Sequence, residues 1–200
     1  MFVSLRNILA ATTVGFVATS AIAADGKIEF TGEITAASCS ATAGAGTGIT
    51  GNKGNSVIAV GLGKVSIDSL KNTGSTNTIV SGTPININLD CGNTATGLTT
   101  VKVKFDPNSG SGVDDKNNAL LKISPGGASG VGIGIFAANN TMLNLAAGDS
   151  FDAPLIATGA GAATQYTANL NIRAAYVANG EATIVPGAAN GTLPYTLTYQ

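Results

Sequence analysis

The sequence predicts an all-β protein, and three observations lead to this fold class. Glycine provides 27 of the 200 residues, and only 10% of the residues are charged. This composition disfavours helices and is typical of short strands joined by turns. Segments in which apolar and polar residues alternate recur along the chain, and turn-forming sequences separate them. Together these features indicate one domain built as a β-sandwich.

The first residues have the pattern of a secretory signal peptide. A short segment with one positive charge, Arg6, precedes the apolar run Ile8–Thr19, and Ala21 to Ala23 form a small-residue cleavage site. The apolar run is shorter than the roughly 20 residues that a membrane-spanning helix needs. We therefore expect residues 1–23 to be removed and the mature chain to be exported.

The mature chain opens with a regular alternating segment, Gly26–Ile34. One face carries Ile28, Phe30, Gly32 and Ile34, and charged or polar residues occupy the other face. The segment is thus expected to be a half-buried β-strand. Alternation alone leaves two interpretations open: the first strand of this domain, or a strand that packs elsewhere.

Two cysteines, Cys39 and Cys91, are expected to form one disulfide, because exported proteins keep such pairs oxidised. The disulfide joins two distant parts of the chain. Residues 41–55 between them are rich in glycine, alanine, threonine and asparagine, so an exposed and mobile connection is expected there.

Further strands are expected where apolar residues alternate with polar ones or form short runs between turns. A short helical turn is expected around Ser66–Lys71. The expected strands are Val57–Leu62, Pro84–Cys91, Thr99–Phe105, Ala119–Ile123, Val131–Ala137, Tyr166–Val177 and Leu193–Tyr199.

The last expected strand alternates strongly, with Leu193, Tyr195, Leu197 and Tyr199 on one face. Pro194 has no N–H to donate, so it belongs at the start of a strand or on an edge. By default Tyr199 is a core residue with a solvated hydroxyl group.

Catalytic and metal-binding arrangements have little support in this sequence. It contains no histidine, which excludes Ser-His-Asp and Cys-His catalysis and the usual zinc sites. Asp106, Asp114 and Asp115 fit neither an EF-hand nor an aromatic-lined glycosidase cleft, so a solvated turn is expected. We expect no enzyme activity, cofactor or metal. The formal net charge of −1 is scattered, which argues against a nucleic-acid partner.

Four segments stand in a fixed order along the sequence: Gly26–Ile34 followed by Cys39, Ile85–Cys91, Val131–Phe136 and Ala174–Val177. Gly187 and Tyr199 stand near the end of the chain. In this order and spacing the segments resemble the chaperone–usher pilins, in particular the major (shaft) subunits of type 1-like fimbriae, and the resemblance covers essentially the whole mature chain.

The resemblance implies an incomplete immunoglobulin-like β-sandwich, the pilin fold, which lacks its last strand and is completed by a donor strand from a neighbouring subunit. It divides the chain into a signal peptide (1–23), an N-terminal extension that is the donor strand (24–35) and a pilin domain (36–200). Donor residues are expected to be Ile28, Phe30, Gly32 and Ile34. The C-terminal groove strand, recognised by the chaperone, is expected to include Gly187, Leu193, Tyr195, Leu197 and Tyr199.

The function that the resemblance implies is a structural subunit of a bacterial fimbria that polymerises by donor-strand exchange and supports cell adhesion. Its expected partners are copies of itself and other pilins, a periplasmic chaperone and an outer-membrane usher, with any host receptor contacted indirectly. It would pass through the periplasm to the cell surface. Two alternatives stay open: a minor adaptor or tip subunit, and a self-contained secreted β-sandwich that binds carbohydrate.

Overall fold

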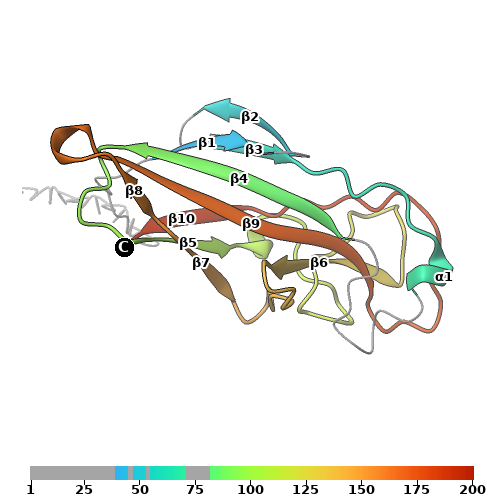
Figure 1. Cartoon of the computed structure of the whole chain (residues 1–200). Coiled ribbons are helices and arrows are strands. Elements are labelled where there is room, and N and C mark those ends of the chain that lie inside the picture. Colours follow the sequence, from blue (N-terminus) through green and yellow to red (C-terminus); the bar gives the residue numbers. More distant parts are fainter. Residues whose placement is uncertain (1–38, 45–46, 53–54, 71–81) are drawn as a thin grey trace, which may run out of the picture. The chain divides into compact units, whose positions relative to one another are not determined.

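A computed structural model describes residues 39–44, 47–52, 55–70 and 82–200. The expected signal peptide and the expected donor residues Ile28, Phe30, Gly32 and Ile34 lie outside these described residues. Nearly all of the regular secondary structure in the described part is β-strand, as the sequence predicts (Figure 1). No helix in the described part is long and apolar enough to cross a membrane.

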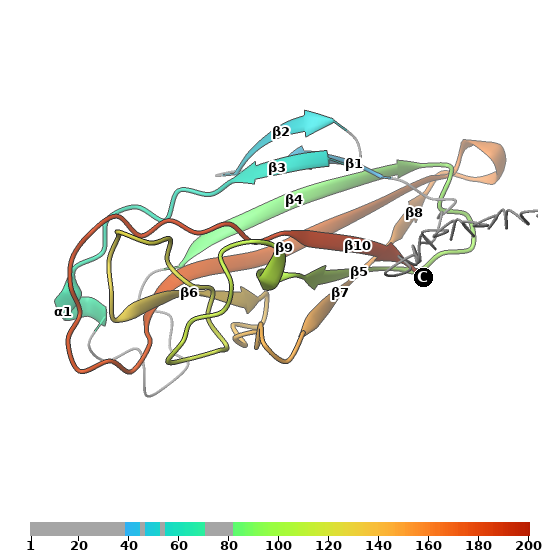
Figure 2. The same cartoon turned by 180° about the vertical axis from the view of Figure 1, so that it is seen from behind.

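The larger sheet has five strands, and all of its pairs are antiparallel. Its order is β1-β4-β9-β6, with β8 also paired to β9. The central strands β4 and β9 are the longest in the domain, and both views show them running together along it (Figures 1 and 2). The strands are β1 (Ser40–Ala43), β4 (Thr83–Gly92), β9 (Gln165–Ala178), β6 (Val131–Ala137) and β8 (Ile156–Thr158).

A second sheet has three antiparallel strands in the order β10-β5-β7. Strand β2 (Gly48–Asn52) pairs only with β3 (Asn55–Ala59) in a separate two-stranded sheet. One turn of helix, α1 (Ile67–Leu70), follows β3 and confirms the helical turn expected there. The three strands of the second sheet are β10 (Tyr195–Tyr199), β5 (Thr100–Phe105) and β7 (Ser150–Pro154).

The core lies between the two larger sheets, and alternation along their strands creates it. On β4, Ile85, Ile87 and Leu89 are buried while the residues between them are more exposed. On β5, Val101 is 0% exposed and Val103 2%. Residues from both sheets belong to one hydrophobic cluster, so the domain is a β-sandwich.

Two predictions about local structure need correction. The segment 41–55 is exposed or half-buried wherever its burial is described, but it is not an irregular connection, because Ala41–Ala43 of β1 pair with β4 and β2 pairs with β3. Ala119–Ile123 is not a strand either. Leu121 forms only isolated bridges to Val113 and Ile133, so its burial comes from packing under the sheet rather than from a ladder.

Candidate functional site: the free edge of strand β10

Strand β10 is paired on one side only. Thr100 and Gln200 exchange two backbone hydrogen bonds of 2.9 Å, which shows which residues of β10 turn their backbone groups towards β5. In an antiparallel ladder every second residue turns its N–H and C=O towards the partner. The backbone groups of Tyr195, Leu197 and Tyr199 therefore point away from β5. No strand in the described part of the chain pairs with that side.

This free edge continues upstream, along the extended segment that leads from β9 to β10. Figure 2 shows that segment in red, as a long run before β10 begins. From Ala188 to Pro194 the even-numbered residues turn their carbonyls towards the domain, as in β10, so the odd-numbered residues again turn their backbone groups outwards. The carbonyls of Ala188, Asn190, Thr192 and Pro194 accept bonds of 2.7 to 2.9 Å from the backbone N–H groups of Ala128, Ser124, Ser111 and Asp106.

The side chains of the same odd-numbered residues face the core but are not covered. Leu193, Tyr195, Leu197 and Tyr199 all pack on the core, but all are only half-buried. Directly across the ladder, Val101 and Val103 on β5 are buried. Neighbouring strands of one sheet thus differ sharply in burial, as they would if β10 lacked both a lateral partner and the side chains such a partner would supply.

Gly187 lies in a bend upstream of β10 rather than in the strand itself. A Cβ atom at this position would lie 2.8 Å from the backbone nitrogen of Ala128 and 2.9 Å from the carbonyl carbon of Gly127. Those atoms belong to the backbone, so they cannot move aside cheaply. Any other residue at position 187 would push the strand away from its support.

Tyr176 defines one end of the free edge, and the sequence patterns did not single out its role. This residue comes from β9 in the other sheet, and its hydroxyl group donates a 2.9 Å hydrogen bond to the carbonyl of Ala189. That carbonyl is one of the outward-facing groups, and the bond places the Tyr176 side chain at this position along the edge. Burial raises the pKa of the Tyr176 hydroxyl. The unoccupied part of the edge therefore runs from Gly191 to Tyr199.

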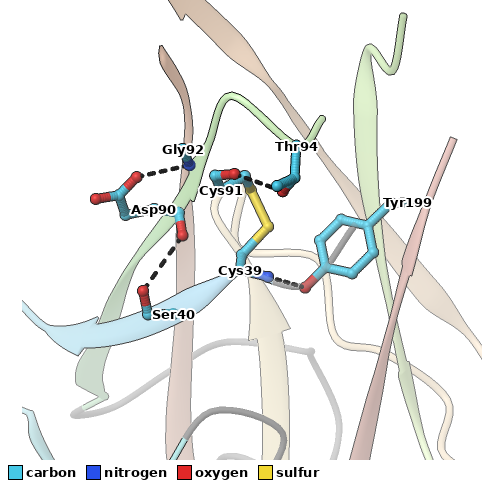
Figure 3. The surroundings of a disulfide bond; sticks show 7 residues. All are labelled: Cys39, Ser40, Asp90, Cys91, Gly92, Thr94 and Tyr199. Carbon is cyan, nitrogen blue, oxygen red and sulfur yellow. Dashed lines mark hydrogen bonds between the residues drawn. A yellow bond between two sulfur atoms is a disulfide. The ribbon is translucent and has the colours of Figure 1, made fainter. Parts of the chain in front are cut away.

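The disulfide lies at the other end. Cys39 and Cys91 are bonded, as expected, and join the start of β1 to the end of β4 (Figure 3). The backbone N–H of Cys39 donates to the Tyr199 hydroxyl oxygen at 3.4 Å, linking the edge strands of the two sheets. Burial raises the pKa of Tyr199, and the Cys39 N–H partly opposes that rise. Burial and the neighbouring Tyr199 also raise the pKa of Tyr195.

Comparisons with known proteins decide the family. The family model described as fimbrial protein matches residues 28–200. The chain belongs to this family. It is 32% identical over its whole length to long polar fimbria protein A of Salmonella typhimurium, covering 99% of that protein. It is 33% identical to the major fimbrial subunit SMF-1 of Stenotrophomonas maltophilia, over 90% of this chain and 95% of that one.

The fold agrees with this family. A subunit in a solved structure of a chaperone–usher pilus matches 95% of this chain and all of its own, with a TM-score of 0.52 and 18% identity. The chain therefore has the all-β pilin fold that the sequence predicts. It is a structural subunit of a bacterial fimbria, and its partners are other fimbrial subunits.

The three aspartates of this fimbrial subunit do not form a common site. Asp106 accepts hydrogen bonds from the backbone and the hydroxyl group of Ser109 and caps a 3₁₀ turn. Asp115 forms an ion pair with Lys122. Asp114 is buried, which corrects the prediction of a solvated turn. Among the described residues, no group of three acidic or cysteine side chains is arranged to hold a metal.

Proposed function

We propose that this subunit polymerises by donor-strand exchange. In this proposal, the free edge of β10 accepts residues 24–35 of another copy, with Ile28, Phe30, Gly32 and Ile34 facing the core. The observation that carries the proposal is the combination found on β10: outward backbone groups that have no partner among the described residues, and core-facing side chains that are only half-buried. An added strand would form hydrogen bonds with these backbone groups and would cover these side chains.

The dimensions of the edge match the donor segment. From Gly191 to Tyr199 the edge is about 27 Å long at about 3.4 Å per residue, and Gly26–Ile34 has the same number of residues. Burying three large apolar side chains contributes roughly 5–9 kcal/mol, at about 1.5–3 kcal/mol each. Gly32 leaves room where the two backbones approach closely.

Chain length separates donation to a neighbour from folding back. Cys39 lies beside Tyr199, at the C-terminal end of the edge. For an antiparallel strand of the same chain, Ile34 would have to lie near Gly191, about 27 Å away along the edge. The chain from Ile34 to Cys39 reaches at most about 17 Å. An antiparallel added strand, which is the slightly more stable arrangement, must therefore come from another copy.

Export would follow the chaperone–usher route. A free edge with a half-exposed apolar surface promotes aggregation, so the subunit needs a temporary cover before assembly. In our proposal a periplasmic chaperone supplies a strand to the same edge after the signal peptide 1–23 is removed, and an outer-membrane usher exchanges it for the extension of the next subunit. The pilin domain is then residues 36–200, and the fibre supports adhesion at the cell surface.

Deletion of residues 26–34 tests this proposal. The full chain and the deletion variant are produced with the assembly machinery, and surface protein is run on gels without boiling. We expect an SDS-resistant ladder for the full chain and none for the variant. A triple substitution of Lys27, Glu29 and Thr31 by serine is the matched control, because it changes the opposite face and should keep the ladder. A ladder from the deletion variant would refute donor-strand exchange through this segment.

A further inference from the structure

A shallow, open depression lies just beyond the Tyr176 end of the free edge. We call it the Val185 platform; its lining includes Lys116, Ser129, Gly180, Glu181, Thr183 and Val185. Val185 is 48% exposed, which makes it one of the three most exposed large apolar residues among those described. The platform does not belong to the edge itself, because Val185 lies upstream of Ala189, where Tyr176 ends the unoccupied part.

The platform is held rigidly by bonds among three segments. The buried carboxylate of Asp114 accepts backbone bonds of 2.9 and 3.0 Å from Lys116 and Asn117. Both of its oxygens also accept from the amide group of Asn179 at 3.1 Å. Ser129 and Val185 exchange two backbone hydrogen bonds of 3.2 and 3.1 Å. Its apolar and charged groups are therefore presented in one fixed arrangement.

The platform and the disulfide lie at opposite ends of the domain. Asp90, next to Cys91, pairs with Thr167 near the beginning of β9, whereas Asn179 directly follows the end of that strand. The strand from Thr167 to Asn179 spans about 40 Å. One subunit therefore cannot bring these two ends together.

Given the proposed function, chain length determines what approaches the platform. In an antiparallel donor strand, Gly26 lies near Tyr199 and Ile34 near Gly191. Cys39 of the donating subunit follows within about 17 Å of Ile34. Val185 lies at most about 20 Å from Gly191, since the segment between them bends at Gly187, and it lies in the direction in which the donor chain continues. The body of the donating subunit, beginning with Cys39, thus has to lie over this stretch.

We propose that the Val185 platform is the contact surface for the disulfide end of the next copy of this chain in the fibre. This inference rests on the proposed function, since the donor strand places the neighbour there. The charges agree with it. Lys116 and Glu181 are exposed, and no described residue forms an ion pair with either. The approaching end carries the exposed carboxylate of Asp90, a partner for Lys116.

Substitution of Val185 by aspartate tests the contact. Fibres of the full chain, of V185D and of the matched control V57D are purified and imaged by electron microscopy. Val57 is 60% exposed on β3, outside the platform. A charge in the contact should weaken it about tenfold, and we expect V185D fibres to bend more between subunits than either of the others. Equal stiffness of V185D and V57D fibres would overturn the proposal.

Two further readouts from the same fibres make the result specific. The unboiled gel reports donor-strand exchange separately: V185D should keep its SDS-resistant ladder, whereas absence of the ladder from the unmodified chain would refute the proposed function instead.

Chemical cross-linking identifies the groups in the contact, because carbodiimide joins contacting amine and carboxylate groups. Mass spectrometry of treated fibres should then show a Lys116–Asp90 link between copies, because the two groups are too far apart within one copy. Links of Lys116 only to Asp115 or Glu181 would contradict the contact.

Discussion

Truncating Leu197 should loosen the fibre more than it harms the subunit. Leu197 faces the core from the middle of β10 and is only half-buried in the subunit. Replacing a fully buried leucine by alanine costs about 2–5 kcal/mol. Because Leu197 is already half-buried, we assign roughly 1–2 kcal/mol of that cost to its contact with the added strand. This loss corresponds to a roughly 5–30-fold change in the strand-release equilibrium.

The assay follows the release of subunits from purified fibres. Fibres of the unmodified chain, of L197A and of T198A are held in SDS at increasing temperature, and the released monomer is measured on gels. Thr198 is the control, because it follows Leu197 in β10 but is exposed on the opposite face. L197A should release monomer at a lower temperature than the other two. Release of L197A and T198A at the same temperature would refute the view that an added strand covers Leu197.

Three further predictions concern the stability of the subunit, each measured by urea unfolding. The double variant C39S/C91S should lose about 4 kcal/mol, because the disulfide closes a loop with a sequence separation of 52 residues; an unchanged midpoint would contradict this. D114A should lose about 3 kcal/mol, because it leaves the buried Asn179 amide and two partly buried backbone N–H groups without their acceptor, and a loss below about 1 kcal/mol would be inconsistent with that network. Burial raises the pKa of Tyr199 in the folded state. The protonated Tyr199 hydroxyl therefore stabilises the folded state fully below the unfolded-state pKa of about 10, and this stabilisation is lost as the pH rises through the folded-state pKa. Stability should therefore fall above about pH 10, and Y199F should show a smaller fall; the same fall in both proteins would argue against this assignment.

Alternation and short apolar runs predicted most of the strands that form the core, but they missed β7, whose Ala153 is buried. Ile85, Ile87 and Leu89 alternate because one face of β4 is buried, and Val131–Ala137 is nearly continuous because β6 is buried on both faces. The sequence also predicted the disulfide and the strand that bears the free edge. The strands depend on residues close to one another in the sequence, and two cysteines allow only one disulfide.

Features that depend on tertiary contacts could not be predicted from patterns. Strand β1 has no apolar alternation and forms because the backbone of β4 is beside it. The bond from Tyr176 to Ala189 joins the two layers of the sandwich, and no spacing in the sequence indicates it. Asp114 is in a turn-like sequence with Asp115, yet the carboxylate of Asp114 is buried because Asn179 reaches it from the end of β9.

A density map of the assembled fibre tests the central claim most directly. Electron cryo-microscopy at side-chain resolution would trace the chain that lies beside β10. We predict that residues 26–34 of a neighbouring copy run antiparallel to β10 between Gly191 and Tyr199, with Ile28, Phe30 and Ile34 over its half-exposed side chains. An unoccupied edge, or an edge filled by the same chain, would contradict the account.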